Sequence, residues 1–154
     1  MHAMPLTLHT PPDPRSTMTS PAHSPLWYEL PHAPAPGSLV GALEAFADNQ
    51  ATLVELTPAQ TGSPAFKLLV LREGASVHAF ANRCAHFGVP LAAQQVQLIY
   101  QPLKSLTCNV HYARYAWASG ACEAGECGDD ALSPVPLVHD ADGWLRIGSR
   151  PDSA

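Results

Sequence analysis

Basic residues are scarce in this chain, which carries eight Lys and Arg against thirteen Asp and Glu in 154 residues, for a net charge of -5. The few basic residues do not gather in any one stretch. Nucleic acids and anionic membrane surfaces are bound through clustered Lys and Arg, so neither is expected as a partner. An acidic surface is suited to docking onto a basic protein, because complementary charge raises the encounter rate.

The first 38 residues lack the features of a targeting segment. They contain no continuous apolar run, no basic stretch leading into one and no pair of adjacent arginines. We therefore predict a soluble, cytoplasmic protein without a membrane anchor. The chain also lacks the motifs of nucleotide-binding loops and of a nucleophilic serine, so no site for substrate chemistry is predicted.

Cysteine is infrequent, and four cysteines are too few for a disulfide scaffold in a chain of this length. Two of them are closely followed by histidine, in Cys84-Ala85-His86 and, after a gap of 21 residues, in Cys108-Asn109-Val110-His111. In an intracellular protein such pairs favour metal binding over disulfide formation. Two short loops are therefore expected to present two thiolates and two imidazoles to a common point.

Two kinds of metal centre use this set of ligands. In a two-iron cluster, thiolates hold one iron and neutral imidazoles the other, which lowers the negative charge and makes reduction easier. Two cysteines and two histidines also bind structural zinc. Zinc motifs usually separate paired ligands by two to four residues, whereas one residue separates Cys84 from His86. The spacing favours the iron-sulfur cluster, with zinc and a metal-free chain as the alternatives.

One folded domain between two tails is expected. Residues 1–25 contain six prolines among Ser, Thr and His. Such a segment buries too little apolar surface to offset its ordering entropy, so disorder is predicted there. The domain is placed at 26–149 and a C-terminal tail at 150–154, and the total length agrees with a single domain.

Short alternating runs between Gly and Pro turns predict β-strands through most of the domain. One helix is expected at 38–47, because Leu39, Leu43 and Phe46 recur on one helical face after Ser38. Such a pattern is typical of an all-β sandwich or small barrel in which hairpins deliver the ligand loops. Strands are predicted at 26–30, 51–56, 66–72, 77–80, 96–100, 105–108, 112–117, 135–139 and 144–147.

At the ligand loops the sequence resembles the Rieske-type [2Fe-2S] ferredoxins and Rieske domains, whose pattern is C-x-H, a spacer and C-x2-H. Residues 82–91 and 108–115 are similar to the family's two cluster loops, and 132–136 to its third, covering loop. The resemblance extends over about 26–149. It implies an all-β fold, namely a Rieske-like antiparallel β-sandwich with a cluster-binding subdomain formed by two hairpin loops. The spacer is longer than is common in the family, which an additional hairpin would explain.

The resemblance further implies one Rieske [2Fe-2S] cluster as cofactor. Cys84 and Cys108 would bind one iron, and His86 and His111 the other. The family pattern also singles out four residues around these ligands: Gly88, Val89, Val110 and Tyr115.

These four residues bear on the reduction potential that the resemblance implies. Gly88 lets the backbone approach the cluster closely. High-potential members carry a bracing disulfide where this chain has Val89 and Val110, and a serine where it has Ala113. Tyr115 remains as a donor to a ligand sulfur. Fewer donors favour the oxidised state, so we expect the lower part of the range of roughly -150 to +300 mV.

The resemblance implies a one-electron carrier that is not itself an enzyme. We expect a ferredoxin that passes electrons from a reductase to an oxygenase or similar oxidoreductase, since the chain is too short to hold a catalytic mononuclear-iron domain as well. The alternatives are a non-catalytic Rieske small subunit of a larger redox enzyme and a redox-sensing regulatory module. Cys122 and Cys127 would be the extra switch of such a module, but a reduced pair is preferred for a cytosolic protein.

Overall fold

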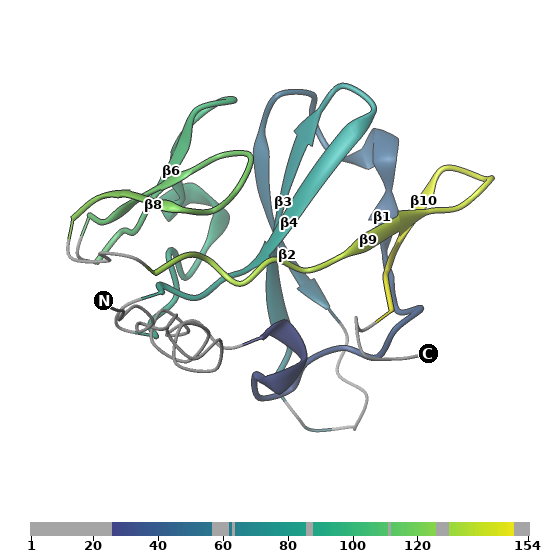
Figure 1. The fold of residues 1–154 in the computed structure, drawn as a ribbon. Coiled ribbons are helices and arrows are strands. Elements are labelled where there is room, and N and C mark those ends of the chain that lie inside the picture. The colour runs from purple at the N-terminus through teal and green to yellow at the C-terminus, as the bar shows by residue number, and fades with distance from the viewer. Residues whose placement is uncertain are drawn as a thin grey trace, which may run out of the picture.

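The computed structural model describes residues 26–56, 62, 64–85, 88–110, 112–125 and 130–149, and the predicted tails, 1–25 and 150–154, lie outside these ranges. The described residues form short antiparallel strands, and their only helical segments are three 3-10 turns (Figure 1). The strands are β1 (Leu39–Ala42), β2 (Ala51–Leu56), β3 (Phe66–Glu73), β4 (Ser76–Ala81), β5 (Ile99–Gln101), β6 (Ser105–Thr107), β7 (Arg114–Ala116), β8 (Cys122–Ala124), β9 (Leu137–His139) and β10 (Trp144–Ile147). The turns are η2 (Trp27–Glu29), η3 (Leu43–Ala45) and η4 (Gln95–Gln97). The predicted all-β class is confirmed, and no helix among these residues is long and apolar enough to span a membrane.

Strand β3 separates two hydrophobic cores. The sheets have the orders β2-β3-β4, β5-β6-β7-β8 and β1-β10-β9, and the first lies between the other two (Figure 1). Successive side chains of a strand point to opposite faces. Leu69 and Leu71 accordingly join the core that includes Leu106 of β6, and Leu68 and Val70 join the core that includes β10. Because the middle of β3 is buried on both faces, its residues 68–71 are continuously apolar rather than alternating.

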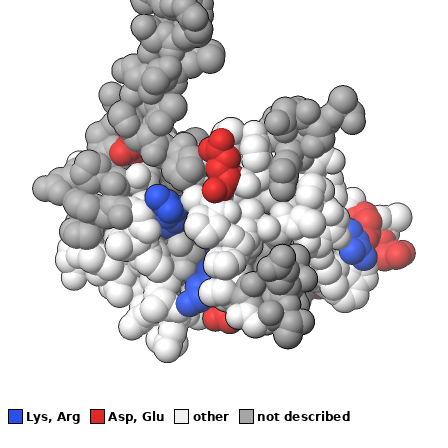
Figure 2. Space-filling view, turned by 90° about the horizontal axis from the view of Figure 1, so that it is seen from below, with Lys and Arg blue, Asp and Glu red and all other residues white. Residues whose placement is uncertain are grey.

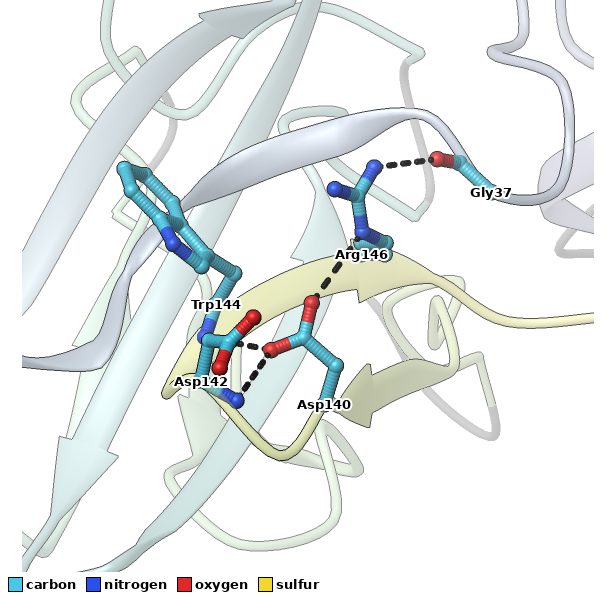
Figure 3. A network of polar contacts seen from close by, with 5 residues as sticks. All are labelled: Gly37, Asp140, Asp142, Trp144 and Arg146. Carbon is cyan, nitrogen blue, oxygen red and sulfur yellow. Dashed lines mark hydrogen bonds and ion pairs between the residues drawn. The ribbon is translucent and has the colours of Figure 1, made fainter.

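The hairpin of β9 and β10 is fixed by one carboxylate, Asp140 (Figure 3). Its Oδ1 accepts the backbone N–H groups of Asp142 and Trp144, each at 3.0 Å, and its Oδ2 lies 3.3 Å from Nε of Arg146. Arg146 also donates to the carbonyl of Gly37 at 3.2 Å, which joins the hairpin to the segment before β1. The backbone N–H of Trp144, then that of Asp142 and the Arg146 guanidinium, hold the pKa of Asp140 below its ordinary value.

The strand predicted at 26–30 is wrong, since this segment forms the 3-10 turn η2. The side chain of Glu29 accepts the N–H of Leu26 at 3.1 Å, and the Glu29 N–H donates to the Leu26 carbonyl at 2.9 Å. Trp27 is thereby turned into the core, with 3% of its surface exposed. The local hydrogen bonds of Glu29 therefore override the strand preference of an aromatic run.

The helix predicted at 38–47 is also wrong. Residues 39–42 form β1, which pairs with β10, and only 43–45 are helical, as the turn η3. The Ser38 hydroxyl donates to the Ala35 carbonyl at 2.6 Å instead of capping a helix. Pairing with β10 satisfies the backbone of this segment more completely than a helix of ten residues would, because short helices are marginal without a packed face.

Between the ligand loops, the strand predicted at 96–100 is replaced by η4 and the short β5. The side chain of Gln95 accepts the Leu53 N–H at 2.6 Å and donates to the Ala51 carbonyl at 3.1 Å. The Gln95 side chain thus satisfies backbone groups at the edge of β2. It does so from the turn η4 rather than from a strand. The remaining predicted strands are present, with β6, β7 and β9 shorter than expected.

Candidate metal centre

The first predicted ligand loop follows directly from β4. Cys84 is fully buried, its carbonyl accepts the Gly88 N–H at 2.8 Å, and its own N–H donates to the Val89 carbonyl. Gly88 has φ +74°, a left-handed conformation that glycine adopts without strain. The loop therefore closes tightly around the sulfur. His86, the second predicted ligand in it, lies outside the described residues.

A buried asparagine holds the two ends of this loop together. Asn82 donates from Nδ2 to the Ala92 carbonyl at 2.8 Å and accepts the Leu91 N–H on Oδ1 at 2.9 Å. Asn82 is 8% exposed, and these bonds satisfy backbone groups that water does not reach. The sequence did not reveal this role, although Asn82 stands within the loop motif. Its position two residues before Cys84 was the available signal.

The second predicted ligand loop joins β6 to β7. Cys108 is fully buried, its N–H donates to the Ala113 carbonyl at 2.8 Å, and its carbonyl accepts the Tyr112 N–H at 2.9 Å. Tyr112 has φ +60°, an uncommon conformation for a residue with a side chain. The second loop is thus as tightly closed as the first. His111 lies outside the described residues.

Tyr115 on β7 connects the two loops. Its hydroxyl lies 3.2 Å from Sγ of Cys84 and accepts the Ala85 N–H at 3.1 Å. The side chain is fully buried, and this burial, followed by the hydrogen bond with Cys84, raises its pKa well above the ordinary value. The phenol therefore stays protonated, so the same oxygen accepts from Ala85 and can donate to a thiolate. The expected contact with a cysteine sulfur is present.

A backbone hydrogen bond also joins the two loops, close to Val89 and Val110 in the sequence. The Asn109 N–H donates to the Leu91 carbonyl at 2.8 Å. Val89 is half-buried against the core that contains both cysteines, whereas Val110 is exposed. Loop-to-loop contact in the described residues thus passes through the backbone of Asn109 and the side chain of Tyr115.

Cys84 and Cys108 are not part of a disulfide, whereas Cys122 is disulfide-bonded. The preferred interpretation of Cys122 as a reduced, buried residue is therefore wrong, and Cys127 lies outside the described residues. β8, which contains Cys122, pairs with β7, and a Cβ at Gly125 would lie 2.8 Å from Cα of Ala113. This close packing places the disulfide-bearing segment against the second ligand loop.

The residues present fit the thiolate half of an iron-sulfur site. Two fully buried cysteines, Cys84 and Cys108, come from separate loops and belong to one core cluster, and the Tyr115 hydroxyl lies against the sulfur of Cys84. Soft thiolates of this kind select iron-sulfur clusters or zinc. No three His, Cys, Asp or Glu side chains of the described ranges gather into a metal site, and both predicted histidine ligands, His86 and His111, lie outside those ranges.

Comparison with known proteins identifies the family. The Rieske [2Fe-2S] domain model matches residues 40–136, which is more than half of the chain. The chain therefore belongs to the Rieske [2Fe-2S] domain family, whose cofactor is one [2Fe-2S] cluster. No curated protein matches the chain as a sequence relative.

Solved structures with similar folds come from carbazole 1,9a-dioxygenase systems. The ferredoxin from Nocardioides aromaticivorans IC177 is 20% identical with a TM-score of 0.55, over 76% of this chain and 100% of that one. The terminal oxygenase from Novosphingobium sp. KA1 is 21% identical with a TM-score of 0.56, over 77% of this chain and 32% of that one. A reduced complex between oxygenase and ferredoxin is 22% identical with a TM-score of 0.54, over 74% of this chain and 30% of that one. The fold is thus that of a whole ferredoxin and of about a third of an oxygenase.

Proposed function

We propose that this protein is a one-electron carrier, a Rieske ferredoxin that receives an electron from a reductase and passes it to an oxygenase or similar oxidoreductase. The observation that carries the proposal is the pair of fully buried cysteines, Cys84 and Cys108, on two loops that Tyr115 connects. Family membership and likeness to a complete ferredoxin agree with it. The Rieske domain is proposed to span 26–149, with tails at 1–25 and 150–154.

In this proposal Cys84 and Cys108 bind one iron of the cluster, and His86 and His111 bind the other. When bound, such a cluster accepts and releases one electron at a time. The chain's own contribution is to exclude water and to fix the ligands. Cys84 and Cys108 are both fully buried, so their sulfurs are held in a site of low dielectric.

Tyr115 supplies a fixed donor at the Cys84 sulfur, because its hydroxyl is already held by the Ala85 N–H. A donor to the sulfur stabilises the more negative, reduced state. Val89 and Val110 supply no such donor from their side chains. One side-chain donor from Tyr115 and none from Val89 or Val110 supports a reduction potential in the lower part of the family range, as the sequence predicts.

Spectroscopy and iron analysis test the ligand assignment. The dithionite-reduced protein should give a rhombic Rieske EPR signal, with two irons for each chain. Cys84→Ser and Cys108→Ser should each abolish the signal, since serine is a poor ligand for this cluster. The control, Cys122→Ser combined with Cys127→Ser, should retain it. One bound zinc and no EPR signal would overturn the proposal.

Kinetics and purification test the carrier role. Charged residues are sparse on the face shown in Figure 2, where a few acidic and basic groups, some of them side by side, are scattered over a mostly uncharged surface, so charge alone does not define a docking face there. A flavin-dependent or iron-sulfur reductase should reduce the oxidised protein in stopped-flow experiments, and the reduced protein should be reoxidised by an oxygenase. Co-purification with a large subunit at fixed stoichiometry would instead show a small subunit of a larger enzyme.

A further inference from the structure

A cavity of about 240 Å³ lies beside the first ligand loop. Two cationic residues line it, Lys67 of β3 and Arg83, which directly precedes Cys84. The remaining lining is mainly apolar and includes Leu30, Phe66 and Pro90. The cavity thus combines positive charge with apolar walls. Asn82 and Gly88 of the first ligand loop also line it, whereas neither Cys84 nor Cys108 does.

Arg83 is the notable group in this cavity. Its Nε is buried and has no hydrogen-bond partner, and no ion pair joins Arg83 to another residue in the described ranges. Its Nη2 lies 3.0 Å from the position that a Cβ on Gly88 would occupy, so the guanidinium lies close to Gly88 in the loop. A cation that is partly removed from water without a counter-charge is costly, and an anion would offset that cost.

Neighbouring polar groups do not supply a counter-charge for Arg83. The Asn82 side chain is already used by the backbone of Leu91 and Ala92. Lys67 donates to the Ala93 carbonyl at 3.1 Å and lies 4.0 Å from a carboxylate oxygen of Glu55, which is a weak, exposed pairing. Lys67 therefore adds a second positive charge to the cavity without neutralising the first.

We propose that this cavity binds a small carboxylate with an apolar body. The planar guanidinium of Arg83 matches a carboxylate in the two-bond arrangement, and Lys67 contributes as a point charge. The walls at Leu30, Phe66 and Pro90 accept an aromatic or aliphatic group. The shape favours such a ligand over a compact oxyanion such as phosphate, which would leave the apolar walls uncovered. The site does not depend on the proposed electron-carrier function.

Calorimetric titration of the cluster-loaded protein with benzoate tests the proposal, with benzamide as a neutral molecule of nearly the same shape. Benzoate should bind saturably with one site for each chain, and benzamide at least tenfold more weakly. Arg83→Gln should weaken benzoate binding at least tenfold and Lys67→Gln several-fold. Lys104→Gln, which removes an exposed positive charge between β5 and β6, should leave it unchanged.

Four results would overturn the proposal: no saturable binding of benzoate, equal binding of benzamide, equal binding by Arg83→Gln, or equal binding of inorganic phosphate. The visible spectrum of the cluster checks that each variant is folded. Should Arg83→Gln not fold, a crystal of the wild-type protein with benzoate decides. Density for the carboxylate within hydrogen-bond distance of Arg83 would support the site, and its absence would refute it.

Discussion

The Tyr115 hydroxyl lies 3.2 Å from the Cys84 sulfur while it accepts the N–H of the next residue, Ala85, at 3.1 Å. One buried oxygen on β7 therefore fixes both the sulfur and the backbone of a loop 30 residues earlier in the sequence. A tyrosine on the strand that follows the second loop thus determines the position of the first. This contact makes the two loops a single structural unit.

Tyr115→Phe should lower both stability and reduction potential. The change leaves the Ala85 N–H without its partner, at a cost of about 1–3 kcal/mol in the free energy of unfolding. It also removes a donor to the Cys84 sulfur, which favours the oxidised state. Denaturant unfolding and protein-film voltammetry measure the two effects. Tyr100→Phe is the matched control, because the Tyr100 ring packs on Trp117 and no hydrogen bond of its hydroxyl is found in the described residues. Equal potentials for both variants would contradict the prediction.

Asn82→Ala should destabilise the first ligand loop. The Leu91 N–H and the Ala92 carbonyl, both buried, would lose their partners, and each costs about 1–3 kcal/mol. We expect faster amide hydrogen exchange at Leu91 and more rapid loss of iron to a chelator. Asn109→Ala is a suitable control, because Asn109 contributes its backbone N–H to the loop contact and that group survives the change. Iron loss at the same rate in the two variants would show that Asn82 is not a clamp.

Tyr112→Gly should stabilise the fold. Tyr112 has φ +60°, and its side chain is 67% exposed, so little packing is lost with the ring. Removing the Cβ relieves a backbone conformation that costs non-glycine residues about 1 kcal/mol or more. Tyr112→Ala removes the ring but keeps the Cβ, and should not stabilise. Thermal unfolding of the two variants compares them directly, and equal midpoints would count against backbone strain at this position.

Asp140→Asn should change stability in a pH-dependent way. The folded pKa of Asp140 is lowered from its ordinary value of 3.8, chiefly by the Trp144 N–H. A lowered pKa stabilises the fold above the unfolded value, and that contribution disappears as the pH falls through the folded value. The wild type should therefore exceed the variant in stability near neutral pH, and the difference should shrink below about pH 4. Unfolding curves from pH 2 to 7 measure it, with Asp142→Asn as a control in the same turn.

The local patterns predicted most of the strands because the residues of β2, β3 and β4 favour the strand conformation that they adopt. Their β-branched and aliphatic residues lie between Gly and Pro turns, and hydrogen bonding to adjacent strands is consistent with that preference. The predictions at 26–30 and 38–47 were wrong because a distant strand or a side chain determined the local conformation there. β10 pairs with residues 39–42, and Glu29 bonds to the backbone of Leu26. Neither contact leaves a periodic signal in the sequence.

The sequence alone determined the family, because cluster ligands must be particular residues at a particular spacing. The motifs C-x-H and C-x2-H specify both the residues and the spacing. It also named Tyr115, since an aromatic four positions after His111 belongs to the same pattern. Only the tertiary structure decided which sulfur Tyr115 touches, that Asn82 clamps the first loop, and that Arg83 stands unpaired beside Lys67 in one cavity. These relationships join residues far apart in the chain or depend on burial. Burial and contacts between residues distant in the chain result from tertiary packing, whereas the ligand motif is fixed by the order of neighbouring residues in the sequence.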